Sequence, residues 1–377
     1  MKIAIDARSL ENNKTGINRY LSGLLRCWKE NKECKFMLYF KDEIPNNNLL
    51  KSDNFELKIL KNPFKFSSNF FFQHFLLSYY LKKDKADFFF SPFYLKPIYC
   101  PVKSAIVLHD ISYEAHPEWF DFKSKFILKL LSKFSAKTAD TIFTVSNFSK
   151  SEIIKYYKIN SDKITVTHLG VDENFIGSKR SFSRCDSFEM TKCGINNKFI
   201  LCVGSMFNRR HIPETIKAFE KVANKYNDYQ LVIIGKNQTH PFIDINSKIK
   251  TANNNFGRKA IIHLDFVEEE ELFVFYNLCE LVIYLSDYEG FGLPIIEAQF
   301  FGKAVITSYN GSLVEVGNNS VEFVRNNTTK EIYNSLEKII SDENYKNKSV
   351  ELGNKNIKRF NWKKCADKTM EEIERVI

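Results

Sequence analysis

The sequence lacks the cysteine spacings and the long hydrophobic runs that mark several classes of protein. No two of its eight cysteines form a C-x-x-C pair or another close spacing of the metal-binding type, so most are expected to be buried thiols of a reducing compartment. No apolar stretch reaches the roughly 18 to 20 residues that span a bilayer, since Gln73 and His74 interrupt the most apolar segment, Phe70–Leu81. The first ten residues, MKIAIDARSL, lack the apolar core of a secretory signal and predict a strand. A cytoplasmic location is therefore expected.

Repeats, low-complexity tracts and nucleic-acid-binding motifs are also missing. With 44% apolar residues in a chain of 377, the protein can bury a large core, and this length is typical of two domains. The formal net charge of +10 suits an anionic partner, which the composition alone leaves open as a nucleotide, a phospholipid surface or nucleic acid. Because the interleaved aromatic and basic motifs of nucleic-acid-binding modules do not occur, no nucleic-acid partner is expected.

The order of apolar and amphipathic segments predicts an α/β fold. Short β-branched or aromatic runs alternate with amphipathic helical stretches from end to end, which is typical of doubly wound parallel sheets. The alternation stops in the polar, serine-rich segment 177–197 and restarts after it. We therefore expect an N-terminal domain over residues 1–176, a linker over 177–197, a second domain over 198–361 and a final helix at 362–377.

Two loops of the first domain follow predicted strands and carry candidate ligand-binding residues. Ligands of doubly wound sheets bind beyond the carboxyl ends of the strands. Gly16 opens a helix behind Thr15, where free backbone N–H groups attract phosphate, although Thr-Gly is also an ordinary helix cap. His109 ends an apolar strand and could hydrogen-bond a substrate hydroxyl or carry a proton, or it could be purely structural.

A loop of the second domain carries two adjacent arginines. In VGSMFNRRHIPE, Arg209 and Arg210 follow a strand and precede a helix that Pro213 helps to start. Two guanidinium groups beside a helix N-terminus could neutralise a diphosphate without a metal. The structural alternative is that both are exposed surface arginines.

The most informative loop is SDYEGFGLPIIEAQ, residues 286–299. The glycines permit a tight bend after an apolar strand, and Pro294 is placed to start a helix, so Glu289 is expected on the loop and Glu297 one turn into the helix. Gly292 and Leu293 would present backbone N–H groups to an anion. A carboxylate accepts two hydrogen bonds at once, which suits Glu297 to the diol of a ribose and Glu289 to hydroxyls of a second ring. The alternatives are solvated surface glutamates, or a metal held by Asp287 and Glu289 on a nucleotide diphosphate.

Several of these segments together resemble a known family. The chain is similar to the retaining glycosyltransferases of the GT-B group called family 4, or glycosyltransferase group 1. The resemblance covers nearly the whole chain, and the two glutamates eight residues apart around EGFGLP are its most specific feature. It rests on these segments, in chain order: MKIAIDARSLENNKTGINRYL, VLHDISY, ADTIFTVSNFSKSEIIKYY, KITVTHLGVDENF, VGSMFNRRHIPETIKAF, SDYEGFGLPIIEAQFFGKAVITS, SLVEV and FNWKKCA.

The resemblance implies two Rossmann-like domains that face each other across a cleft, and a final helix at 362–377 that packs back on the first domain. It also implies a role for each candidate residue. It implies that Glu297 binds the donor ribose and that Glu289 contacts hydroxyls of the transferred sugar. Arg209 and Arg210 would hold the diphosphate, and His109 would reach the donor sugar, so that His109, Glu289 and Arg210 form the catalytic set. Further donor contacts are implied for the backbone of these residues: Gly16, Phe266, Val267, Phe291, Gly292 and Leu293.

The family's reaction is sugar transfer from a nucleotide-diphosphate sugar with retention at the anomeric carbon, without a metal or another cofactor. Such chemistry requires positive charge beside the leaving diphosphate and a fixed acceptor hydroxyl, rather than a protein nucleophile. Four positions depart from the family pattern. Arg210 stands where lysine is more common, Ser205 where arginine or threonine is, His211 where asparagine or glycine is, and Val314 where proline is usual.

The acceptor is expected to be a glycan or a lipid-linked sugar of cell-surface polysaccharide synthesis, such as lipopolysaccharide or capsule. In the predicted helix 122–137, lysines recur every four residues beside large apolar side chains, a pattern that suits the inner face of an anionic plasma membrane. The alternative is a helix whose apolar side faces the core and whose lysines are solvated. Other functions left open are a sugar-nucleotide epimerase or hydrolase on the same scaffold and a non-catalytic nucleotide-sugar binding protein.

Overall fold

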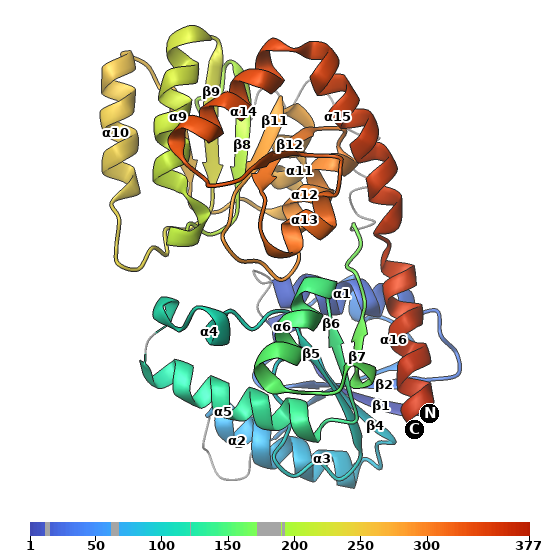
Figure 1. Cartoon of the computed structure of the whole chain (residues 1–377). Helices are drawn as coiled ribbons and strands as arrows, with labels where there is room; N and C mark the ends of the chain where they lie inside the picture. The colour runs from blue at the N-terminus through green and yellow to red at the C-terminus, as the bar shows by residue number, and fades with distance from the viewer. Residues whose placement is uncertain (12–15, 62–67, 121, 172–189, 191–192) are drawn as a thin grey trace. The chain divides into compact units, whose positions relative to one another are not determined.

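A computed structural model describes residues 1–11, 16–61, 68–120, 122–171, 190 and 193–377. The chain divides into two compact units, one made of Met1–Gly170 together with Asn361–Ile377 and the other of Val171–Phe360 (Figure 1). Thr15 and most of the predicted linker, namely residues 177–189, 191 and 192, lie outside the described residues. No helix among the described residues is both long enough and apolar enough to span a membrane.

The first unit is built on a parallel sheet of seven strands in the order β3-β2-β1-β4-β5-β6-β7. The strands are β1 (Lys2–Asp6), β2 (Lys35–Phe40), β3 (Phe55–Ile59), β4 (Phe88–Ser91), β5 (Lys103–Leu108), β6 (Thr141–Thr144) and β7 (Ile164–Val166). The helices are α1 (Gly16–Trp28), α2 (Asn69–Phe71), α3 (Leu77–Lys83), α4 (Ser112–Ala115), α5 (Phe122–Thr138), α6 (Asn147–Tyr157) and α16 (Trp362–Val376). Most strand residues are buried, because the helices cover the sheet, and the strand sequences are accordingly continuous apolar runs.

One predicted helix is divided. The pattern of residues 70–83 predicts a single helix, whereas the structure has α2, a π-helical segment at Phe72–Leu76 and then α3. The π segment buries Gln73 and His74, the polar residues that interrupt the apolar run. Such single-turn π segments are frequent at functional sites.

The second unit repeats the plan with six parallel strands in the order β10-β9-β8-β11-β12-β13. The strands are β8 (Lys198–Val203), β9 (Tyr229–Ile234), β10 (Ile261–Leu264), β11 (Leu281–Tyr284), β12 (Ala304–Ser308) and β13 (Glu322–Val324). The helices are α9 (Ile212–Lys225), α10 (Ile245–Phe256), α11 (Glu269–Leu278), α12 (Leu293–Phe300), α13 (Gly311–Gly317), α14 (Thr329–Ser341) and α15 (Glu343–Asn356). Pro213 and Pro294 lie in the first turns of α9 and α12, as the sequence predicts.

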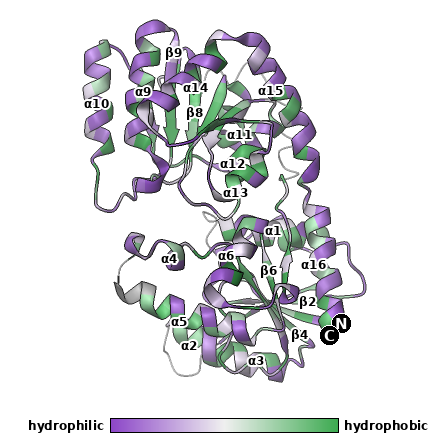
Figure 2. Ribbon diagram, viewed as in Figure 1, coloured by the Kyte–Doolittle hydropathy of each residue, from purple (hydrophilic) through white to green (hydrophobic). Residues whose placement is uncertain are grey.

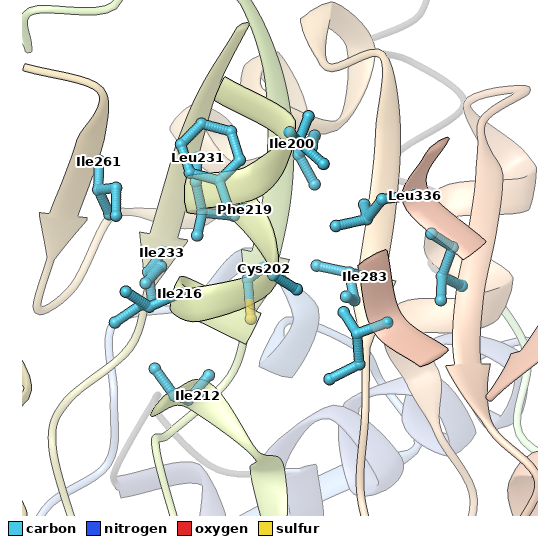
Figure 3. Close-up of a cluster of buried hydrophobic side chains, with 14 of the residues drawn as sticks. Ile200, Cys202, Ile212, Ile216, Phe219, Leu231, Ile233, Ile261, Ile283 and Leu336 are labelled. Atoms are coloured by element: carbon cyan, nitrogen blue, oxygen red, sulfur yellow. The ribbon is translucent and has the colours of Figure 1, made fainter. Parts of the chain in front are cut away.

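A continuous apolar core fixes the helices of the second unit on its sheet. In Figure 3, side chains from strands β8 and β9 meet those of α9, and Ile283 of β11 lies near Leu336 of α14. All of these side chains belong to one buried cluster, and Ile200, Phe219 and Ile233 are fully buried within it. Burial of this kind stabilises by roughly 25 cal/mol per Å² of apolar surface, so the core is what holds the strand ends, and the loops that follow them, in fixed positions.

Helix α16 is the far end of the chain, yet it belongs to the first unit. Its first turn is capped by Asn361, whose side chain accepts a hydrogen bond from the Lys364 amide, and the Trp28 indole N–H donates to the Ala366 carbonyl at 3.3 Å. Trp362 packs so closely on α1 that a Cβ atom built on Gly23 would lie 2.4 Å from its ring. The absence of a side chain at Gly23 is therefore what allows α16 to dock.

Gly23→Ala is expected to destabilise the protein. Overpacking of this kind typically lowers the free energy of unfolding by about 1–3 kcal/mol, which outweighs the gain of up to ~1 kcal/mol from alanine in a helix. The matched control is Gly16→Ala in the same helix, where the added Cβ would have no described atom within 4 Å. Thermal and urea denaturation measure both variants; equal stability of the two would contradict the proposed docking of Trp362 on Gly23.

Candidate functional site

The strand order of the second unit places its candidate residues together. Strands β9 and β10 lie on one side of β8 and strands β11 to β13 on the other, so the connections leave in opposite directions at the boundary between β8 and β11. In doubly wound sheets, ligands bind beyond the carboxyl ends of the strands at such a point. Strand β8 leads to Arg209 and Arg210, and β11 leads to Glu289.

Both arginines make an ion pair with Glu289. Arg210 Nη2 lies 3.2 Å and Arg209 Nε 3.6 Å from Glu289 Oε1, which also accepts a hydrogen bond of 2.7 Å from the Ser286 hydroxyl. The side chains of Arg209, Arg210 and Glu289 are only 18%, 12% and 14% exposed. The alternatives of exposed arginines and of a solvated Glu289 are therefore wrong.

Arg210 remains charged in this buried position. Burial by itself would lower the pKa of its guanidinium, but Glu289 and Tyr284 more than offset that effect, and the pKa is raised. The guanidinium carbon lies 4.2 Å from the centre of the Tyr284 ring, in a cation–π arrangement. The Nε and Nη1 atoms of Arg210 are buried and have no hydrogen-bond partner among the described residues. Buried donors without partners are rare in folded proteins and point to a ligand.

Asp287 ties the two loops of this site together. Its backbone N–H donates to the Arg209 carbonyl at 3.1 Å, and its Oδ1 lies 2.7 Å from His211 Nε2 and 3.1 Å from Asn327 Nδ2. His211 has a positive φ of 53°, a conformation that asparagine and glycine adopt most readily. This explains why the family often has those residues here.

Neither Asp287 nor His211 was singled out as a positioning residue from the sequence. The asparagine or glycine that the family often has at the His211 position indicates a backbone with positive φ, and it could have identified this turn from the sequence. Asp287 and Glu289 are each engaged by other side chains, and the described residues contain no group of three or more histidine, cysteine, aspartate or glutamate residues suited to a metal ion.

The bend between the two glutamates has the geometry that the glycines predict. Gly292 has a φ of 108°, and a Cβ atom there would lie 2.7 Å from the Leu313 side chain, so only glycine fits. The Ser312 hydroxyl bonds to the carbonyls of Glu289 and Phe291 at 2.7 and 3.0 Å and fixes the loop. The bend thereby brings the backbone of Gly292 and Leu293 to the start of α12.

Glu297 lies in α12 and is held differently from Glu289. It is 3% exposed, and its Oε2 accepts a hydrogen bond of 2.6 Å from the Tyr276 hydroxyl. Tyr276 in turn stacks on Phe301 with ring centres 5.9 Å apart. The alternative of a solvated glutamate is thus wrong here too, and the carboxylate has a fixed orientation.

Phe266 and Val267 follow β10, two strands away from β8 in the sheet order. Phe266 is 48% exposed and Val267 is half-buried.

In the first unit, His109 follows β5 and Gly16 opens α1. The Nε2 of His109 lies 3.0 Å from the Pro92 carbonyl, and since a carbonyl can only accept, Nε2 carries the proton. Burial lowers the pKa of His109, so its imidazole is neutral at neutral pH. Its ring meets the Tyr20 ring edge-on at 5.0 Å, and Gly16 is exposed.

The first unit also contains a cavity of about 550 Å³ that the sequence analysis did not identify. It is lined by Arg8 after β1, Lys41 after β2 and Phe93 after β4, together with Gln73 and Ile127. The strand order reverses between β1 and β4, so the cavity lies where this class of sheet binds ligands. Arg8 bonds to the fully buried Asp6 at 2.6 Å and to Gln73, and its charge sits between Phe72 and Phe93.

Two family models match the chain and together cover most of it. Residues 188–359 match the model described as glycosyl transferases group 1, and residues 16–175 match the model for glycosyltransferase family 4.

Curated relatives and a solved structure agree with these matches. The serotype-specific mannosyltransferase WbdA of Escherichia coli is 27% identical over 284 residues, which are 74% of this chain but only 34% of WbdA, so the match spans about a third of that protein. O-antigen chain mannosyltransferase B of Escherichia coli is 27% identical over 274 residues, 71% of this chain and 69% of that protein. The structure of Anabaena HepE in complex with UDP and glucose covers 100% of both chains with a TM-score of 0.77 at 16% identity, a likeness of fold. From its two doubly wound units and its two family matches, the chain belongs to the group 1 glycosyltransferases, which have the GT-B fold.

Proposed function

We propose that this protein transfers a sugar from a nucleoside-diphosphate sugar to a hydroxyl of a glycan or lipid-linked acceptor during the synthesis of a cell-surface polysaccharide. The relatives support the proposal through their names, which describe serotype-specific and O-antigen chain mannosyltransferases. HepE supports a nucleotide-sugar donor, because its structure holds UDP and glucose.

The observation that carries the proposal is the pair of buried Arg210 nitrogens that have no hydrogen-bond partner in the part of the chain that the structure describes. A diphosphate offers oxygen acceptors to such donors, and a guanidinium can bind two of them in parallel. Arg209 adds a second positive charge, while Glu289 neutralises one, so the cluster of three side chains keeps a net positive charge for an anionic ligand. The backbone N–H groups of Gly292 and Leu293, at the start of α12, are assigned to the same phosphates.

The two glutamates are assigned to different parts of the donor. Ser286, Arg209 and Arg210 each contact Oε1 of the Glu289 carboxylate, and Oε2 is assigned to a hydroxyl of the transferred sugar. Glu297, oriented by Tyr276, is assigned to the ribose. The remaining donor contacts stay as expected from the resemblance: phosphate at Gly16 and Phe291, and nucleobase at Phe266 and Val267. His109 is assigned to the transferred sugar as a neutral imidazole.

We propose retention of the anomeric configuration without a protein nucleophile. In the second unit, burial raises the pKa of the Cys202 thiol, beside the site, to about 12, so it remains protonated, and the charge of Glu289 is committed to two arginines. The bond between the anomeric carbon and the phosphate oxygen breaks, the acceptor oxygen bonds to the same face of that carbon, and the departing phosphate takes the acceptor proton. Arg210 stabilises the charge that grows on the phosphate, which is the role that a metal ion has in other enzymes.

The cavity of the first unit is proposed as the acceptor site. It lies beyond the carboxyl ends of β1, β2 and β4, and it combines charged walls, from Arg8, Lys41 and Glu11, with apolar ones. Small-molecule sites typically combine a few polar groups with apolar surface. For a sugar, the polar groups would bind hydroxyls and the apolar surface would pack on the face of the ring. An epimerase or hydrolase on the same scaffold would need no such acceptor site, so nucleotide release that depends on added acceptor separates the two functions.

A panel of nucleoside-diphosphate sugars is expected to identify one donor by thermal shift. At a concentration of about 100 times Kd, a bound donor stabilises the protein by about 2.7 kcal/mol, a shift of several degrees in Tm. The shift is expected to be the same in EDTA, because Arg209 and Arg210 supply the positive charge. A shift that appears only with added magnesium or manganese would contradict the proposed metal independence.

Glu289→Gln and Glu297→Gln are expected to affect different kinetic constants. Glutamine keeps a hydrogen-bond acceptor for Ser286 or Tyr276 and avoids the unpaired buried hydroxyl that alanine would leave. Glu289→Gln should lower kcat about tenfold or more with little change in nucleotide affinity, and Glu297→Gln should weaken nucleotide binding about tenfold, or ~1.4 kcal/mol.

The matched control for these variants is Glu322→Gln. Glu322 starts β13 and is likewise a poorly exposed, paired glutamate, 2.9 Å from Lys338 and hydrogen-bonded by Ser335. It should leave both constants unchanged. Steady-state kinetics and calorimetry with the nucleoside diphosphate make the measurement, and equal losses in both constants for Glu289→Gln and Glu297→Gln would count against the assignment.

A further inference from the structure

Most of the large apolar side chains that the structure shows as exposed lie on three segments of the first unit, residues 69–83, 93–103 and 122–138. These three segments are called the apolar–basic face. Sixteen large apolar side chains are exposed among the described residues, and nine of them lie on these three segments. They are Phe70, Phe75, Tyr79, Ile98, Tyr99, Phe126, Ile127, Leu130 and Phe134. Contiguous apolar surface of this kind marks a binding surface.

Helix α5 shows the feature most clearly, because several of its large apolar side chains are exposed while two of its serines are buried. Phe126 and Leu130 are 62% and 61% exposed, while Ser132 and Ser135 are buried against the unit. Leu128 packs on a buried cluster and Ala136 is fully buried, so the alternative of an apolar side that faces the core describes only part of α5. Figure 2 shows hydrophobic and hydrophilic bands alternating along α5, in contrast to the mainly hydrophobic strands of the sheets.

The three segments are joined by hydrogen bonds into one surface. The Ile98 amide bonds to His74 Nδ1 at 3.3 Å, and the Ser78 hydroxyl bonds to the Tyr99 carbonyl at 2.6 Å. The Lys96 amide bonds to the Ser135 hydroxyl of α5 at 3.1 Å. These contacts fix residues 93–103 between α5 and the 69–83 segment.

The charge of the face has one sign. Its three segments contain nine lysines and not one aspartate or glutamate, in a chain with 45 acidic residues. Lys129 is paired with Glu114 at 2.9 Å, whereas Lys82, Lys83, Lys133 and Lys137 are exposed. Exposed phenylalanine and leucine side chains beside exposed lysines complement the interface of a bilayer with anionic headgroups.

We propose that the apolar–basic face rests on an anionic lipid bilayer. The apolar side chains enter the boundary between headgroups and acyl chains, and the lysines contact the phosphates. The sequence pattern indicates this surface only for the helix at 122–137, and the structure extends it to two further segments.

The face is continuous with the cavity of the first unit. Phe70 and Ile127, both more than half exposed, belong to the face and also line the cavity, whose deeper residues Gln73 and His74 are buried. A molecule anchored in the bilayer can therefore place a polar head in the cavity without leaving the membrane. This consequence rests on the proposed function and favours a lipid-linked acceptor over a soluble glycan.

Flotation of the full chain with vesicles tests the docking surface without any donor or turnover. The chain should float with vesicles of equal parts phosphatidylcholine and phosphatidylglycerol and much less with phosphatidylcholine alone. Phe126→Ser with Leu130→Ser, and separately Lys133→Glu with Lys137→Glu, should each weaken partition about tenfold or more. All four side chains are exposed, so the fold should be retained, which circular dichroism checks.

The controls make the same changes in the second unit: Phe242→Ser, at a side chain that is 73% exposed, and Lys248→Glu with Lys250→Glu. These should bind vesicles like the unaltered chain. Failure of the unaltered chain to float, or equal binding by face and control variants, would overturn the proposal. Light scattering measures whether the unaltered chain is a dimer. If the Phe126 and Leu130 changes dissociate such a dimer but leave vesicle binding unchanged, the face binds a second copy of the chain instead. None of these outcomes depends on sugar transfer, so the proposed function is tested separately.

Discussion

The ion pair between Arg210 and Glu289 is the interaction on which the candidate site depends. A buried pair is stable only when its remaining donors and acceptors are also satisfied, because removing charges from water is unfavourable. Here Ser286 and Arg209 complete the shell of Glu289, and Tyr284 lies beneath Arg210, but two nitrogens of Arg210 have no partner among the described residues. The arrangement thus holds a fixed positive charge with free donors, which is what a departing diphosphate requires.

The pair forms because of the topology of the sheet. Strands β8 and β11 are neighbours although about 80 residues separate them, and their carboxyl ends deliver one arginine loop and one glutamate loop to the same place. Asp287 then joins the loops through the Arg209 carbonyl and His211. The first unit follows the same rule, since its cavity opens beyond β1 and β4, where its strand order reverses. One architectural principle accounts for both the arginine–glutamate cluster of the second unit and the cavity of the first.

The sequence predicted the parts of the structure that depend on local pattern. The strands β1 to β11, the proline-started helices α9 and α12 and the bend at Gly292 follow from short stretches of chain, whereas β12 and β13 were not predicted. The contact of Asp287 with His211 spans 76 residues and depends on how two loops approach, which no local pattern specifies.

The same limit applies to α5 and to the cavity. Periodicity indicates that α5 has an apolar side, but which of its residues are buried depends on the surface against which the helix packs. Ser132 and Ser135 are among the residues that are buried. The cavity combines residues from Arg8 to Leu131 that only the fold brings together. Likewise, the burial of Glu297 against Tyr276 follows from the packing of α11 on α12, two helices that the sequence predicts separately.

The most direct measurement of the central claim is the preference for a nucleoside diphosphate over the corresponding monophosphate. Calorimetry gives the ratio of the two dissociation constants for the unaltered protein and for the double variant Arg210→Gln with Glu289→Gln. The double variant removes both charges of the pair, so neither is left without its partner. If Arg210 binds the terminal phosphate, the unaltered protein should prefer the diphosphate by about tenfold or more, and the double variant should lose most of that preference, a difference of ~1.4 kcal/mol or more. An unchanged ratio in the double variant would contradict the assignment of Arg210 to the diphosphate.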